Sequence, residues 1–112
     1  MTTPAGADGG AAPIIDIPAE SRFVYRDGGF EAELVYHLNG KRLVLIHTEV
    51  PDALSGRGLG GRLVRAAVER AQREGLTIVP WCPFARRWLS EHDDMASLVP
   101  IDWASQRPDE AG

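Results

Sequence analysis

The dipeptide Asn39-Gly40 restricts the fold of this chain most, because it stands between two segments with strand patterns. Asn-Gly is the most typical two-residue turn of an antiparallel hairpin, in which both central residues take positive φ. Residues 30–38 alternate apolar and polar side chains, as a half-buried strand does. The return segment, residues 41–50, is apolar on both faces at 43–46. The sequence therefore predicts an antiparallel pair whose second strand lies near the middle of a sheet.

A helix pattern follows the hairpin. Residues 58–74 carry apolar side chains at helical spacing, and Gly75 provides a stop. Residues 76–81 are again rich in branched apolar side chains, and a strand–helix–strand succession of this length implies two parallel strands. A short strand is expected at 22–25, and one or two short helices over 83–98. We expect an α+β fold: a small, mostly antiparallel sheet with one β-α-β unit and short C-terminal helices.

The two ends of the chain differ in composition from its middle. Residues 1–20 are rich in Ala, Gly, Pro and Asp, and residues 104–112 contain no aromatic or branched apolar residue. We therefore expect a disordered N-terminal tail, a folded domain over residues 21–103 and a flexible C-terminal tail. The formal net charge of −4 lies mostly in these ends, since residues 21–100 hold 11 Lys or Arg and 10 Asp or Glu. Such a nearly neutral domain argues against a nucleic-acid partner.

The residue inventory excludes several classes of site. A single cysteine rules out an intramolecular disulfide and a cysteine-rich zinc site. The three histidines lack metal-ligand spacing, so no metal is expected. No apolar run approaches the about 18 residues that a membrane span needs, and nothing resembles a secretory signal. We expect a soluble, cytoplasmic protein without a membrane partner, as a monomer or a weak homodimer.

The segment from Ser55 to Gly61 contains four glycines between a strand and a helix. Glycine lowers the stability of a helix start, but it lets another group approach the backbone N–H donors closely. The first turn of a helix has unpaired N–H groups and the positive end of the helix dipole, which favour phosphate. Nearby arginines can add charge-assisted contacts. The candidate cofactor-binding residues in this segment are Gly56, Arg57, Gly58, Leu59, Gly60, Gly61 and Arg62.

Three phosphate-binding patterns and a plain turn compete as explanations of this segment. A Walker A loop needs Gly-Lys-Ser/Thr at its end, which the chain lacks. The fingerprint GxGxxG can be placed on residues 56–61, but the strands and the acidic residue of a dinucleotide-binding half do not follow. The pyrophosphate loop Gln/Arg-x-x-Gly-x-Gly/Ala is matched by Gly58-Leu59-Gly60, with Ser55 at the Gln/Arg position. The fourth interpretation is a glycine-rich turn without a ligand.

Three ordered motifs together resemble a known superfamily. They are His47-Thr48-Glu49-Val50-Pro51, the glycine loop, and Val79-Pro80-Trp81-Cys82-Pro83-Phe84. Over about residues 22–100 they are similar to the GNAT N-acetyltransferases, in particular the small YjdJ-like branch. The resemblance implies a minimal GNAT-like fold that binds acetyl-coenzyme A (acetyl-CoA) between two diverging strands, residues 43–50 and 76–81. Thr48 and Val50, on the first of these strands, are further cofactor-binding candidates.

The resemblance places the acyl thioester near Cys82 and His47. Cys82 could accept acetyl covalently if a helix N-terminus or a cation stabilises its thiolate, although a small buried apolar role fits equally well. His47 could be a base for the amine or for the thiol, and Glu49 could orient it or act itself. Strand alternation puts both on the face of Leu45. Alternatively the amine attacks directly, with a backbone N–H near Val50 stabilising the oxyanion.

The sequence therefore predicts an acetyl-CoA-dependent N-acyltransferase that transfers acetyl to an amine of a small molecule or a protein. The alternative is an acyl-CoA-binding module without useful catalysis, such as a sensor or a partner-dependent subunit, and Ser55 slightly favours it. A structural interaction protein is a third, weaker interpretation. In so short a chain, the acceptor pocket must come from the first two strands, the segment after Cys82, or a second subunit.

Overall fold

The computed structural model describes residues 12–107, so positions 1–11 and 108–112 of the two expected tails lie outside the described residues. The five strands are β1 (Ile15–Ile17), β2 (Arg22–Asp27), β3 (Phe30–Asn39), β4 (Arg42–Glu49) and β5 (Thr77–Pro80). The helices are α2 (Leu59–Glu74), α3 (Pro83–Glu91) and α4 (Asp93–Ala96), with short 3₁₀ turns η1 (Pro18–Glu20) and η2 (Asp52–Leu54). The sheet order is β1-β2-β3-β4-β5, antiparallel except for the parallel pair β4–β5. The α+β prediction with one β-α-β unit is confirmed.

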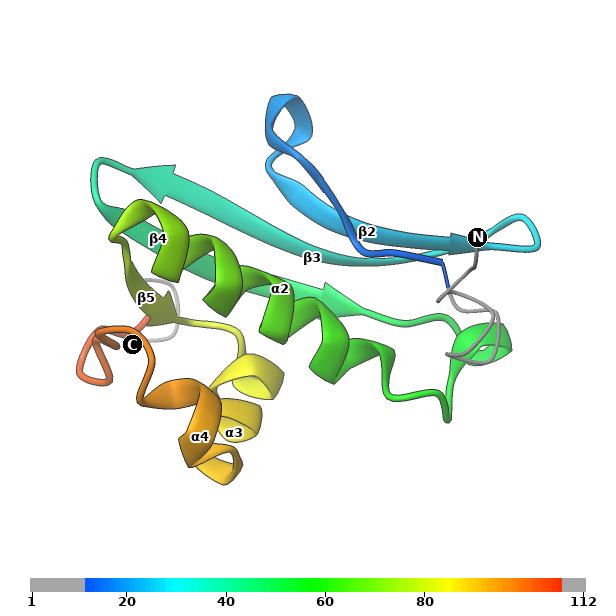
Figure 1. Cartoon of the computed structure of the whole chain (residues 1–112). Coiled ribbons are helices and arrows are strands. Elements are labelled where there is room, and N and C mark those ends of the chain that lie inside the picture. The colour runs from blue at the N-terminus through cyan, green and yellow to red at the C-terminus, as the bar shows by residue number, and fades with distance from the viewer. Residues whose placement is uncertain (1–11, 108–112) are drawn as a thin grey trace, which may run out of the picture.

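The core lies between the sheet and α2, which crosses one face of the sheet, while α3 and α4 pack beside it (Figure 1). Leu34, Leu43 and Leu45 of the sheet and Leu63 and Val68 of α2 are fully buried in this layer. The expected hairpin is present, but Asn39 ends β3 and pairs with Arg42, so the two turn residues are Gly40 and Lys41. Gly40 has a φ of 61°, whereas the positive φ expected at Asn39 is not found. Among the described residues, no helix is both long enough and apolar enough to cross a bilayer.

Strand β1 lies within the stretch expected to be a tail. It pairs with β2, and its Asp16 binds a buried cluster through two hydrogen bonds. The hydroxyl of Tyr36 donates to Asp16 Oδ1 at 2.6 Å, and Arg70 Nη1 donates to Asp16 Oδ2 at 3.0 Å and to the Tyr36 oxygen at 2.8 Å. Arg70 is only 7% exposed, and a buried guanidinium needs such partners. The folded unit therefore begins before residue 21.

The chain after α4 returns to the edge of the sheet. The backbone N–H of Asp102 donates to the carbonyl of Ile78 at 2.8 Å. Its carboxylate pairs with Arg42 at 3.0 Å, and this guanidinium holds the pKa of Asp102 below its usual range. Residues 104–107 were expected to be part of a tail. They follow closely after Asp102, which is hydrogen-bonded to β5.

Two glycines in the first turn of α2 leave room for α3. A Cβ added at Gly60 would lie 2.6 Å from Cζ of Phe84, and one at Gly61 would lie 2.5 Å from Nε1 of Trp88. Neither glycine has a positive φ. Close packing, and not backbone conformation, therefore explains why both positions are glycine.

We expect Gly60→Ala to lower the free energy of unfolding by about 1 kcal/mol. Overpacking against the Phe84 ring costs about 1–3 kcal/mol, and the better helix propensity of alanine recovers at most about 1 kcal/mol. In a Phe84→Ala background the clash is gone, so the same change should become neutral or stabilising. Urea unfolding of the four proteins measures this coupling. An equal cost in both backgrounds would show that the ring does not set the requirement for glycine.

A second prediction concerns pH. Burial, followed by the hydrogen bond to Asp16, raises the pKa of Tyr36 to about 12. Because this is above the usual value of about 10, the protonated phenol stabilises the folded state fully below about pH 10, and this contribution is lost as the pH rises towards 12. Tyr36→Phe should cost about 1–2 kcal/mol near neutral pH, and the difference from the parent should shrink between pH 10 and 12. A constant difference in denaturant unfolding would contradict this.

Candidate functional site

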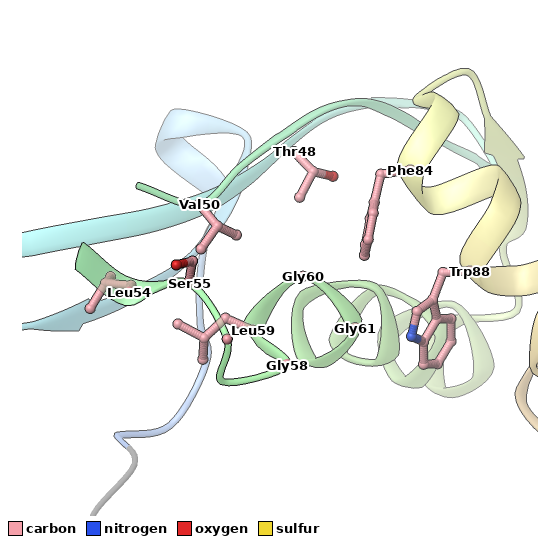
Figure 2. Close-up of a pocket in the computed structure, with 11 residues that line it drawn as sticks. Thr48, Val50, Leu54, Ser55, Gly58, Leu59, Gly60, Gly61, Phe84 and Trp88 are labelled. Atoms are coloured by element: carbon pink, nitrogen blue, oxygen red, sulfur yellow. The ribbon is translucent and has the colours of Figure 1, made fainter. Parts of the chain in front are cut away.

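A cavity of about 490 Å³ lies where the end of β4, the glycine loop, the start of α2 and α3 meet (Figure 2). No charged side chain is among the described residues that line it. The lining comprises Thr48, Val50, Leu54, Ser55, Gly56, Gly58, Leu59, Gly60, Gly61, Phe84 and Trp88. An apolar cavity with a few polar groups at one side is typical of small-molecule sites.

A β-bulge decides which side chains of β4 face this cavity. The register of β3 and β4 shifts between Val35 and Tyr36, which leaves Ile46 as an extra residue in β4. An extra residue reverses the alternation of side chains that follow it. Leu45 faces the core before the bulge, and Thr48 faces the same side after it.

The same bulge places His47 and Glu49 on the opposite face of the sheet. Simple alternation predicted that His47 shares a face with Leu45, and the extra residue explains the difference. Nε2 of His47 lies 3.3 Å from Oε1 of Glu49, and their side chains are 55% and 66% exposed. With Glu33 of β3 they form a group whose potential metal-ligand atoms lie within 4.8 Å of one another. Glu33, however, already accepts a hydrogen bond from Arg22 at 2.9 Å.

The structure brings Cys82 to Thr48 and not to His47. Cys82 precedes the first residue of α3 and is 3% exposed. Its backbone N–H donates to the carbonyl of Leu45 at 2.8 Å, and its Sγ lies 3.2 Å from Oγ1 of Thr48. The thiol thus lies behind a residue that lines the cavity. It also lies at the N-terminus of a nine-residue helix, where the helix dipole stabilises negative charge.

Strands β4 and β5 separate beside this thiol. Their last paired residues are Leu45 and Pro80, and proline has no backbone N–H to continue the ladder. The N–H of Trp81 instead donates to the carbonyl of Val79 at 3.0 Å. From Ile46 onwards, β4 therefore has no strand partner on this side among the described residues. Pairing ends where the resemblance implied that the strands diverge.

The glycine loop presents the first turn of α2 to the cavity. Gly56 and Gly58 have φ of 80° and 71°, in the left-handed region that favours glycine. Gly58 precedes the helix without a side-chain cap, and the first turn contains no acidic residue. The hydroxyl of Ser55 donates to the carbonyl of Asp52 at 2.8 Å, so its proton already takes part in a hydrogen bond to η2. Backbone N–H groups and the helix dipole are the polar features offered here.

The two arginines predicted to contact phosphate have other partners. Nη1 of Arg57 pairs with Asp27 at 2.7 Å, and this hydrogen bond raises the pKa of Arg57. Both side chains of the pair are about half exposed. Nη2 of Arg62 donates to the carbonyl of Ala12 at 2.9 Å, and its guanidinium lies 5.5 Å from the centre of the Tyr25 ring. Neither arginine lines the cavity.

Phe84 and Trp88 line the cavity, although the motifs did not predict them as binding residues. They are four residues apart, so they share one face of α3. Trp88 stacks on His92 at 3.9 Å and lies 5.8 Å from the guanidinium of Arg65. The sequence feature that could have indicated this role is the four-residue spacing of two aromatic side chains shortly after Cys82. In the structure, these side chains pack against Gly60 and Gly61.

The comparisons with known proteins agree with this arrangement. The chain is 40% identical over 62 residues to the protein NATD1 of Gallus gallus and of Mus musculus, a match covering 54% of this chain and 56% of each relative. The chain thus matches little more than half the length of these relatives. An NMR structure of a GCN5-like protein from Staphylococcus aureus is 28% identical, with a TM-score of 0.62, over 81% of this chain and 91% of that one.

The sequence pattern of a protein family described as "GCN5-related N-acetyl-transferase" matches residues 22–98. This match covers more than half of the chain and includes all five structural features of the site: the end of β4, the glycine loop, α2, the end of β5 and α3. The chain therefore belongs to the GCN5-related N-acetyltransferase family.

Proposed function

We propose that this protein is an acetyl-CoA-dependent N-acyltransferase that transfers acetyl to an amine of a small molecule or a protein. One observation carries the proposal: a single cavity joins the N-terminus of α2 to the Thr48–Cys82 pair. The helix end offers N–H groups to phosphate, and the residue pair lies where β4 and β5 stop pairing. Membership of an acetyltransferase family supports the same reaction.

The cavity fits part of the donor. Its volume of about 490 Å³ corresponds to about 16 water molecules, enough for the diphosphate and part of the pantetheine arm. Gly56 and Gly58 allow close approach to the backbone, while Val50 and Leu59 provide apolar contact. When bound, acetyl-CoA supplies the activated acetyl thioester. Arg57 is a candidate for the outer phosphates, because its exposed ion pair is readily exchanged.

Cys82 is the proposed nucleophile of a covalent route. A bond forms between its Sγ and the acetyl carbonyl carbon while the bond to the CoA sulfur breaks, and the thiol proton passes to the departing sulfur. Attack of the amine on acetylated Cys82 then releases the amide and restores the thiol. Thr48 positions Sγ from 3.2 Å, and the N-terminus of α3 stabilises its charge.

We assign His47 and Glu49 to the acceptor and not to the thiol. Their side chains lie on the open face of β4, away from the cavity that contains the glycine loop. A proton taken from the amine by this pair would support either attack on acetylated Cys82 or direct attack on the thioester. Loss of such a base typically reduces the rate by about 10²–10⁴-fold.

A binding module without useful catalysis is the second candidate. It is favoured by the burial of Cys82, which is 3% exposed, and by the placement of His47 on the other face of the sheet. The two candidates share the cavity and differ in turnover.

Calorimetric titration tests donor binding. We expect micromolar affinity for acetyl-CoA, weaker binding of dephospho-CoA and none of NAD. Gly58→Asp should weaken acetyl-CoA binding at least about tenfold, because it puts negative charge at the N-terminus of α2. Gly75→Asp is the matched control, since Gly75 ends the same helix at a similar φ of 69°. Failure to bind acetyl-CoA at millimolar concentration would refute the proposal.

The covalent route has its own test. After incubation with acetyl-CoA alone, intact mass spectrometry should show one added acetyl group, absent from Cys82→Ala. This variant should lose about 100-fold or more in kcat but keep its affinity for acetyl-CoA. Turnover close to the parent value in Cys82→Ala would instead establish direct attack by the amine.

A further inference from the structure

A second cavity, of about 240 Å³, lies beside the segment that joins β5 to α3. Its walls include Trp81 and Pro83, the two neighbours of Cys82 in the chain, together with residues 105–107. The first cavity reaches Cys82 through Thr48. Cys82 lines neither cavity itself, but it contacts a wall residue of the first and stands between two wall residues of the second in the chain. The first cavity is the proposed donor site.

The segment from Asp102 to Arg107, here called the C-terminal strap, closes the second cavity. The indole N–H of Trp81 donates to the hydroxyl of Ser105 at 2.9 Å. A guanidinium N–H of Arg107 donates to the carbonyl of Ile46, the bulged residue directly before His47. The strap therefore reaches the part of β4 that β5 leaves without a strand partner.

Arg86 is the positive group on which the character of this cavity depends. It lines the cavity, and no acidic residue is among the described lining residues. Arg86 donates to the carbonyls of Pro80, at 3.2 Å, and of Trp103, and its guanidinium lies 5.8 Å from the Trp103 ring. Neutral carbonyls and an aromatic ring orient a guanidinium without neutralising its charge. The carboxylate of Asp102, the acidic residue of the strap, is engaged by Arg42.

We propose that this second cavity is the acceptor site and that it selects amines carrying an anionic group, a carboxylate or a phosphate, which Arg86 binds. This inference rests on the proposed function, since it names the acceptor class for that reaction. Its volume of about 240 Å³ corresponds to about eight water molecules, which suits a small molecule. The neighbours of Cys82 in the chain, Trp81 and Pro83, line the same cavity as Arg86, so an amine whose anionic end binds Arg86 would lie near the thiol-bearing segment.

Three amines of similar length test the selection: β-alanine, 2-aminoethylphosphonate and propylamine. They differ only at the end distant from the amine, which is a carboxylate, a phosphonate or a methyl group. At fixed ionic strength we expect kcat/KM to be at least about tenfold higher for an anionic amine than for propylamine. The ratio between the two anionic amines tells which group the site prefers.

Variants of Arg86 distinguish the effect of its positive charge on the acceptor from its hydrogen bond to the Trp103 carbonyl, which holds the strap. Arg86→Gln should abolish the preference over propylamine, whereas Arg86→Lys, which keeps the charge, should retain part of it. Arg87→Gln is the matched control, because Arg87 is exposed on the same helix and does not line the cavity. None of these changes should alter the affinity for acetyl-CoA measured by calorimetry. An unchanged preference in Arg86→Gln would overturn the proposal.

A readout independent of turnover keeps this inference distinct from the proposed function. The indole N–H signal of Trp81 in a ¹⁵N-correlated NMR spectrum should shift on titration of the full chain with β-alanine or 2-aminoethylphosphonate, and not with propylamine. This shift without turnover would support the site while the enzymatic proposal fails. Efficient acetylation of propylamine, with no selective shift of Trp81, would leave the enzyme intact and refute the anionic acceptor.

Discussion

The end of parallel pairing at Leu45 and Pro80 is the constraint on which the rest of the site depends. Because Pro80 cannot donate, the chain turns, and the N–H of Cys82 takes the last carbonyl of the ladder. This fixes the start of α3 and the position of the thiol. It also leaves the end of β4 available to other groups, on one side to the first cavity and on the other to the C-terminal strap.

The glycine loop serves two separate physical purposes. Gly56 and Gly58 are needed for backbone conformation, because their φ values are positive. Gly60 and Gly61 have ordinary helical backbone and accommodate the rings of Phe84 and Trp88. The same rings form part of the cavity wall (Figure 2). The shape of the cavity and the packing of two helices are therefore set by the same contacts.

Local signals predicted the fold well and the site only in part. The hairpin after β3, the helix stripe of α2 and the glycine loop are encoded by neighbouring residues, and all three are present, although the hairpin turn lies one residue later than the Asn39-Gly40 pattern predicted. The bulge at Ile46 is not visible locally, because it exists only in the pairing of β4 with β3. Strand β1 was missed for a similar reason: the partners that hold Asp16 are 20 and 54 residues away in the sequence.

The bulge determines which side chains of β4 line the cavity, and therefore which chemical groups the cavity contains. One residue, Ile46, keeps Thr48 and Val50 on the inner side of β4 and the ionisable pair His47 and Glu49 on the outer side. If Ile46 took a regular place in the ladder instead of being bulged, the two sets would exchange, since side chains alternate with a period of two. The cavity wall that we propose to contact the neutral pantetheine arm would then carry an imidazole and a carboxylate. In this family member, the bulge thus keeps the cavity proposed for the donor apart from the side chains proposed to take a proton from the amine.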